Sequence, residues 1–142
     1  MRNRSLRQAL LVALVAGFAF MGFTGLAVAG QPTALPFFLE FTDVNPCTGN
    51  VVTVTMIGTL YLHEHDGRTV VRIPRTITTS DGFEGRGTLS EVINGKIEKF
   101  TLNDMLTHES GDKFRAHFVL VIDLSTGTVR VLKGGVQICL GP

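Results

Sequence analysis

The sequence has 142 residues, of which 44% are apolar and only 18% are charged, with two cysteines, no tryptophan and 16 glycines. This length fits one domain of ordinary size rather than two. A formal net charge of +1 argues against a nucleic-acid-binding protein, which needs a basic surplus to neutralise phosphates. The low charge and positive mean hydropathy by themselves indicate a membrane protein or an unusually apolar globular protein.

Residues 1–29 have the features of a secretory signal peptide. The first seven residues include three arginines, an uncharged stretch continues to Gly30, and Ala27-Val28-Ala29 places small residues where a signal peptidase reads them. We therefore expect cleavage after Ala29, which leaves residues 30–142 as a single domain. The alternative is an uncleaved membrane anchor, because about 20 apolar residues can span a bilayer.

Removal of this segment changes the charge of the domain. All 12 acidic residues but only 10 of the 13 basic residues lie beyond it, so the mature domain carries a charge of −2. This balance weakens the electrostatic capture of nucleic acid or anionic lipid. We expect a secreted protein, extracellular or periplasmic, that has no contact with the membrane after cleavage.

Cys47 and Cys139 are predicted to form one disulfide, because export places them in an oxidising compartment. The bond would join the start of the mature domain to its end and stabilise it by roughly 4.6 kcal/mol in the chain-entropy model. The alternative is a reactive or metal-binding thiol pair, which the lack of a C-x-x-C motif disfavours.

Turn dipeptides at short intervals predict a series of hairpins in the mature chain. Asp66-Gly67, Asp81-Gly82 and Asn94-Gly95 tolerate the positive φ angles of type I′ turns. The segments between the turns are rich in Val, Ile, Thr and Phe and show no helical period. We expect an all-β fold, an antiparallel meander of about seven to eight strands, near residues 35–42, 51–65, 68–79, 83–93, 96–108, 113–123 and 128–140.

Closure of this meander into a small barrel would remove its two open edges. Glycines inside the expected strands, among them Gly58, Gly85 and Gly87, favour a strongly coiled sheet, because such glycines often mark bulges or barrel corners.

The strand at 113–123 is apolar on both faces near its end. Phe118, Leu120 and Ile122 share one face, while Val119 and Val121 occupy the other. Either a covering segment or a second subunit would explain this pattern. We favour residues 36–41 as the cover, and hence a monomer, over a homodimer formed through residues 118–122.

Two short motifs and a closing cysteine suggest a family resemblance. Asn45-Pro46-Cys47-Thr48-Gly49 precedes the first long strand, residues 109–114 open the sixth, and Cys139 ends the last. This pattern resembles a group of small exported bacterial proteins with an Asn-Pro-Cys box near the mature N-terminus and a cysteine near the C-terminus. The resemblance implies an exported, disulfide-closed β fold, and it implies no catalytic role.

His63 and His65 form the sharpest candidate for a metal site. Residues at i and i+2 of a strand project to the same face, a spacing that zinc sites on sheets use, and Asp66, His108 or His117 could add a third ligand. The adjacent Asp66-Gly67 turn favours the alternative of a solvated strand end. We therefore expect no metal and no other cofactor.

Asp104 interrupts an apolar series on the strand at 96–108. A carboxylate that faces a closed interior has a raised pKa, which is a common mark of a functional group. The interpretation that we favour is a bulge at Asn103-Asp104 that turns the acid outward. An acid–histidine pair with His108 along the same strand is a third interpretation.

Tyr61, Arg115 and His117 could line the mouth of a barrel. Small barrels hold one apolar ligand with a few polar groups that orient it, although the interior can equally be filled by Phe and Leu. No G-x-S-x-G elbow and no phosphate-binding glycine loop occurs in the sequence. We therefore expect a non-enzymatic exported β-barrel that binds a small apolar ligand or a cell-envelope partner.

The alternative function is a barrel enzyme of isomerase or cyclase type that acts on an apolar substrate, by analogy with barrels of the allene oxide cyclase fold. This alternative predicts that Asp104, His108 or His117 points into an open cavity.

Overall fold

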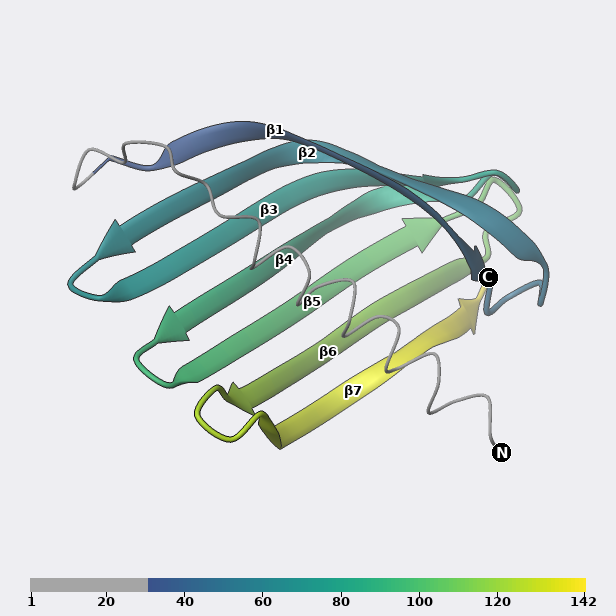
Figure 1. The fold of residues 1–142 in the computed structure, drawn as a ribbon. Helices are drawn as coiled ribbons and strands as arrows, with labels where there is room; N and C mark the ends of the chain where they lie inside the picture. The colour runs from purple at the N-terminus through teal and green to yellow at the C-terminus, as the bar shows by residue number, and fades with distance from the viewer. Residues whose placement is uncertain (1–30) are drawn as a thin grey trace.

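The computed structural model describes residues 31–142, except for the side chains of residues 135 and 136. Within this range, seven antiparallel strands form one sheet in their sequence order (Figure 1). The strands are β1 (Thr33–Val44), β2 (Val51–His65), β3 (Arg68–Thr79), β4 (Glu84–Asn94), β5 (Ile97–Thr107), β6 (Lys113–Asp123) and β7 (Thr128–Gly141). The all-β meander is thus confirmed, and each expected strand bound lies within two residues of the observed one. No membrane-spanning helix occurs among the described residues.

The turn residues account for these strand ends. Asp66 and Gly67 have φ angles of 49° and 73°, the left-handed conformation that a type I′ turn requires at both central positions. Gly82 and Gly95 also have positive φ, each at a predicted turn. Local turn chemistry therefore sets where each hairpin reverses.

The sheet is curled (Figure 1), and its two faces differ in composition. Alternate residues of a strand point to opposite faces, and β5 buries every second residue from Glu98 to Leu106. We call the face that carries Phe100 and Leu106 the concave face, and the opposite one the convex face. Most of the buried apolar side chains belong to the concave face.

The concave face holds two apolar clusters. The first lies near the disulfide and consists of Val52, Val54, Ile77, Phe83, Leu106 and Phe114, with Phe41, Cys47 and Met56 packed against them. The second consists of Phe100, Leu102 and Leu120, with half-buried Leu89, Ala116, Phe118 and Ile122 beside them. The core is therefore more completely packed at the disulfide end than at the other end.

The predicted disulfide is present and draws the two sheet edges together at one end. Cys47, in the loop between β1 and β2, is bonded to Cys139 of β7 across a sequence separation of 92. Close by, Gln137 Nε2 donates a hydrogen bond to Asp43 Oδ2 at 2.9 Å. Among the described residues β1 and β7 form no ladder, so the sheet is open and the expected closure into a barrel is not confirmed.

The proposed cover for the convex side of β6 is absent. Residues 36–41 belong to β1 and pair with β2 at the other edge of the sheet. Val119 and Val121 are half-buried without them. The interpretation of residues 36–41 as a covering segment is therefore wrong, because this segment is needed to extend the sheet.

Candidate functional site

One row of paired residues crosses the middle of the concave face and alternates large with small side chains. Its members, from β1 to β7, are Phe37, Gly58, Arg75, Gly87, Asp104, Ala116 and Gln137. A Cβ atom at Gly87 would lie 1.7 Å from Asp104 Oδ1, and one at Gly58 would lie 2.2 Å from the Pro74 carbonyl oxygen. Glycine is therefore required at both positions, where neighbouring strands approach closely and the sheet bends.

Arg75 and Asp104 form a buried ion pair across Gly87. Arg75 Nη2 donates to both carboxylate oxygens of Asp104 at 2.8 Å, and the two side chains are 1% and 5% exposed. Burial raises the pKa of the Asp104 carboxyl, and the charge and hydrogen bonds of Arg75 oppose this rise. The small side chains on either side leave room for the pair to lie across the strands.

The outward bulge that we favoured for Asp104 is wrong. The pairing of β5 with β4 and β6 runs through Asn103 and Asp104 without a shift in register, so the carboxylate stays on the concave face. Arg75, two strands away, supplies the charge that makes its burial tolerable. The carboxyl faces inward, as the alternative interpretation expects.

A pair of acidic residues lies on the concave face further from the disulfide than Arg75 and Asp104. Glu91 of β4 and Glu98 of β5 are only 8% and 9% exposed. Burial, together with a hydrogen bond and charge repulsion from Glu98, raises the pKa of Glu91 to about 8. Glu91 is therefore mostly protonated at neutral pH and can act as a hydrogen-bond donor or as an acid.

Sequence analysis missed these two glutamates and Arg75. All three occupy concave positions in the strand alternation, two residues from Leu89, Phe100 and Ile73 respectively. Each of them is a charged residue that alternates with apolar residues on the same face of its strand. This pattern could have identified all three, as it identified Asp104.

Two buried polar atoms of the concave face have no hydrogen-bond partner among the described residues. They are Nε of Arg75 and Oε1 of Glu91. Because buried polar groups are almost always hydrogen-bonded, each marks a place where a bound molecule would gain a contact. On the convex side, Nδ1 of His117 is also buried without a partner.

Tyr61, Arg115 and His117 all lie on the convex face, opposite Asp104. Tyr61 is 42% exposed and pairs with Arg72, while Arg115 is exposed and lies between Met105 and Ile138 in its row. The structure therefore does not bring these three residues together with Asp104, and they do not line the concave face.

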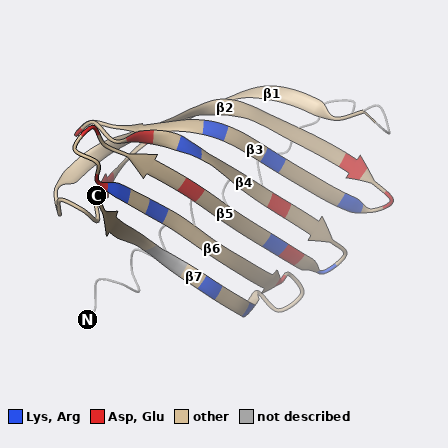
Figure 2. Ribbon diagram, turned by 180° about the vertical axis from the view of Figure 1, so that it is seen from behind, with Lys and Arg blue, Asp and Glu red and all other residues tan. Residues whose placement is uncertain are grey.

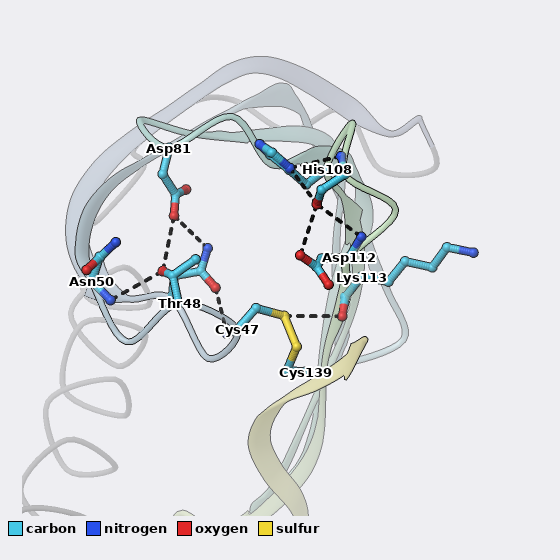
Figure 3. Close-up of a disulfide and its surroundings, with 10 residues drawn as sticks. Cys47, Thr48, Asn50, Asp81, His108, Asp112, Lys113 and Cys139 are labelled. Atoms are coloured by element: carbon cyan, nitrogen blue, oxygen red, sulfur yellow. Dashed lines mark hydrogen bonds between the residues drawn. A yellow bond between two sulfur atoms is a disulfide. The ribbon is translucent and has the colours of Figure 1, made fainter. Parts of the chain in front are cut away.

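His108 lies in the loop between β5 and β6, near the disulfide (Figure 3). Its Nδ1 is 2.8 Å from Ser110 Oγ, which donates to Asp112 Oδ2 at 2.9 Å, and its ring packs against Phe83 with centroids 4.9 Å apart. No hydrogen bond joins His108 to Asp104 in the described part of the chain, so the acid–histidine pair is not formed.

His63 and His65 share the convex face at the β2–β3 turn, with ring centroids 6.3 Å apart. His65 Nε2 lies 3.0 Å from Asp66 Oδ2, and both of these side chains are largely exposed. Within residues 31–142, no three His, Cys, Asp or Glu side chains are placed to hold a metal ion. The geometry is that of a solvated strand end.

The Asn-Pro-Cys segment supports the disulfide end of the fold (Figure 3). Asn45 is 2% exposed; its Oδ1 accepts a hydrogen bond from the Cys47 backbone N–H, and its Nδ2 donates to Asp81 Oδ2, both at 2.8 Å. Asp81 also accepts a hydrogen bond from Thr79 Oγ1 at 2.5 Å. Asn45 thus positions Cys47 for its bond to Cys139.

Comparison with known proteins gives no relative: no protein-family model matches the chain, and neither a curated protein nor a solved structure is significantly similar to it.

Proposed function

We propose that this protein is exported and binds a small, largely apolar molecule on its concave face without transforming it. The observation that carries the proposal is the buried Oε1 of Glu91, which has no hydrogen-bond partner among the described residues. Glu91 itself pairs with the apolar residues Val71 and Phe100 on the concave face. A ligand with an apolar body and one hydrogen-bonding group fits such a surface, because a few polar groups suffice to orient it.

The part of the concave face furthest from the disulfide offers the apolar surface for this ligand. Leu89, Phe118 and Ile122 are half-buried there, around the fully buried Phe100. Leu132 pairs with Leu120 and is 51% exposed because β7 is an edge strand. The disulfide end, in contrast, is filled by its own side chains.

Export of the protein is the second part of the proposal. The expected signal peptide at residues 1–29 lies outside the described residues, and the disulfide supports an oxidising compartment, either extracellular or periplasmic. The Asn-Pro-Cys resemblance to exported bacterial proteins points the same way. The mass of the intact secreted protein tests this: we expect a chain that starts at Gly30 and lacks two hydrogens, and a retained N-terminus would contradict cleavage.

Ligand binding can be tested with N-phenyl-1-naphthylamine, an apolar dye with one N–H donor whose fluorescence rises in apolar surroundings. Leu132→Glu places a charge on the concave face, so we expect it to weaken dye binding about tenfold or more. Ile138→Glu is the matched control, because Ile138 is also on β7 and 55% exposed but lies on the convex face, paired with Arg115. Equal binding by both variants would overturn the concave site.

The raised pKa of Glu91 favours a second candidate function, an isomerase or cyclase in which this carboxyl transfers a proton to or from an apolar substrate. Mass spectrometry and chromatography of apolar compounds recovered after incubation with the protein distinguish the two functions. Conversion that is lost in Glu91→Gln supports the enzyme, whereas compounds that bind and return unchanged support the binding protein.

A further inference from the structure

The two faces of the sheet carry opposite charge. Figure 2 shows charged residues along strands from β2 to β7, and the strand alternation assigns each to a face. The concave face carries one basic residue, Arg75, and the acidic residues Asp43, Glu64, Glu91, Glu98 and Asp104. The convex face carries the exposed residues Arg68, Arg72, Arg86, Lys99, Lys113, Arg115 and Lys133.

Few acidic residues balance this convex charge among the described residues. Glu40 and Glu84 are the exposed ones, and the buried Asp123 is paired with Arg130. No ion pair in the described part of the chain involves Arg72, Arg86 or Arg115. The convex face therefore has guanidinium groups that are free to meet an anion.

The convex face is also hollowed where the sheet bends. An open depression of about 550 Å³ crosses β2, β3, β4 and β5, directly over the row that contains Gly58 and Gly87. Because these glycines have no side chains, the neighbouring strands approach closely, and the backbone there forms part of the depression. The other residues that line it include Thr59, Thr76, Arg86, Thr88 and Asn103.

The residues that line this depression have the chemistry that a polyhydroxylated ring would need. The hydroxyl groups of Thr59 and Thr88 and the amide of Asn103 can both donate and accept hydrogen bonds, as a polyhydroxylated ring requires. The Thr76 hydroxyl donates to the Ile57 carbonyl oxygen at 3.2 Å and can still accept a hydrogen bond. Ile57, which is 55% exposed, and Pro74 provide an apolar surface for the C–H face of a ring. Arg86 adds a planar group that can bind a carboxylate through two hydrogen bonds.

A second basic residue near the depression is placed where it could contact another sugar of the same chain. Arg86 and Arg115 both pair with Met105, so they lie two strands apart in one row, about 10 Å from each other. The domain as a whole carries −2, so long-range attraction to a polyanion is weak and recognition depends on contacts in the groove.

We propose that the convex depression binds an acidic polysaccharide, with the carboxylate of one uronate residue on Arg86. Thr59, Thr76, Thr88 and Asn103 bind its hydroxyl groups, and Arg115 pairs with a carboxylate further along the polymer. This site lies on the opposite face from the proposed apolar ligand and does not depend on it.

Isothermal titration calorimetry tests the proposal. The exported, oxidised protein is titrated at low salt with an oligogalacturonate of defined length. We expect binding that weakens as salt is added and that Arg86→Gln weakens about tenfold. Lys96→Gln is the control, because Lys96 is exposed in the β4–β5 turn outside the groove, and it should leave the affinity unchanged within about twofold. Circular dichroism checks that both variants are folded.

Three results would overturn this site. The first is no binding at low salt, and the second is equal affinity of Arg86→Gln and the unaltered protein. The third is a lack of selectivity, in which a neutral oligosaccharide of the same length, single-stranded DNA or phosphatidylglycerol vesicles bind as tightly as the oligogalacturonate.

Discussion

Arg75 and Asp104 depend on each other and on the small residue between them. Each is nearly fully buried, and each supplies the charge that the other lacks. Because water cannot reach them, the loss of one partner leaves an uncompensated charge in the core, which costs far more than the pair contributes over apolar residues of similar size.

Substitution of one member of this pair should therefore destabilise the protein strongly. We expect Asp104→Leu to lower the free energy of unfolding by about 3–5 kcal/mol, because Arg75 remains charged and buried. The double variant Arg75→Met/Asp104→Leu should regain most of this loss. Urea denaturation measures both, and a double variant no more stable than the single one would contradict the account.

Glu91 predicts a specific dependence of stability on pH. Its pKa is about 8 in the folded protein and near 4.5 in the unfolded chain, so between these values the folded state holds a proton that the unfolded state releases. The contribution of Glu91 to the free energy of unfolding is fully present below its pKa in the unfolded chain. It falls as pH rises to 8, by at most about 1.4 kcal/mol per pH unit. Glu91→Gln should flatten this decline in urea denaturation between pH 5 and 8, and an unchanged slope would contradict the assignment.

The wrong orientation predicted for Asp104 has a physical cause. An unpaired carboxylate is costly to bury, so an outward orientation is favoured for Asp104 as long as no partner for it is known. Its partner comes from β3, 29 residues earlier, and only the register of three strands reveals that the two side chains meet. A sequence shows which residues share a face of one strand, but it does not show which residues lie beside them on other strands.

At the scale of the strands, turns and glycines together determine the shape of the sheet. Hairpin turns such as Asp66-Gly67 are local features, so the strand bounds could be predicted closely from the sequence. The glycines within strands indicated coiling as well. Where the bend occurs depends on their alignment across strands, as for Gly58 and Gly87 on either side of Arg75.

Gly87→Ala tests the bend directly. The added Cβ would lie 1.7 Å from Asp104 Oδ1 and 2.9 Å from the Asn103 carbonyl oxygen, so the ion pair or the strand must move. We expect a loss of about 1–3 kcal/mol in the free energy of unfolding. Thr88→Ala, at the next residue on the convex face, should change it by less than about 0.5 kcal/mol. Similar effects of the two substitutions would show that the site is not tightly packed.

For the whole molecule, the disulfide restrains an open sheet. β1 and β7 do not pair in the described residues, so Cys47–Cys139 and the Gln137–Asp43 hydrogen bond hold the two edges near each other at one end. The cysteine pairing followed from the expected compartment and the number of cysteines. The expected closure into a barrel could not be established from local turn and glycine patterns, because closure depends on the accumulated twist and bend of all seven strands.

Replacement of both cysteines by serine should destabilise the protein by about 2–5 kcal/mol, since the crosslink restricts a long loop of the unfolded chain. Thermal denaturation with and without dithiothreitol measures this effect. The reductant should lower the melting temperature of the native protein toward that of the variant and leave the variant unchanged. A variant as stable as the native protein would show that the β1–β7 contact does not need the crosslink.

The division of charge between the faces is also a property of the whole molecule. Neighbours such as Glu98 and Lys99 cancel along the chain, yet they point to opposite faces of the sheet. For this reason basic residues do not cluster in the sequence, although most of those in the strands share the convex face of the fold.

The most direct test of the central claim, an apolar ligand on the concave face, is a two-dimensional ¹H–¹⁵N NMR titration of the exported protein with N-phenyl-1-naphthylamine. The account predicts saturable shift changes concentrated at Leu89, Phe118 and Leu132, which lie on the open part of the concave face. Shift changes centred on convex residues such as Thr76, or none at saturating dye, would contradict it.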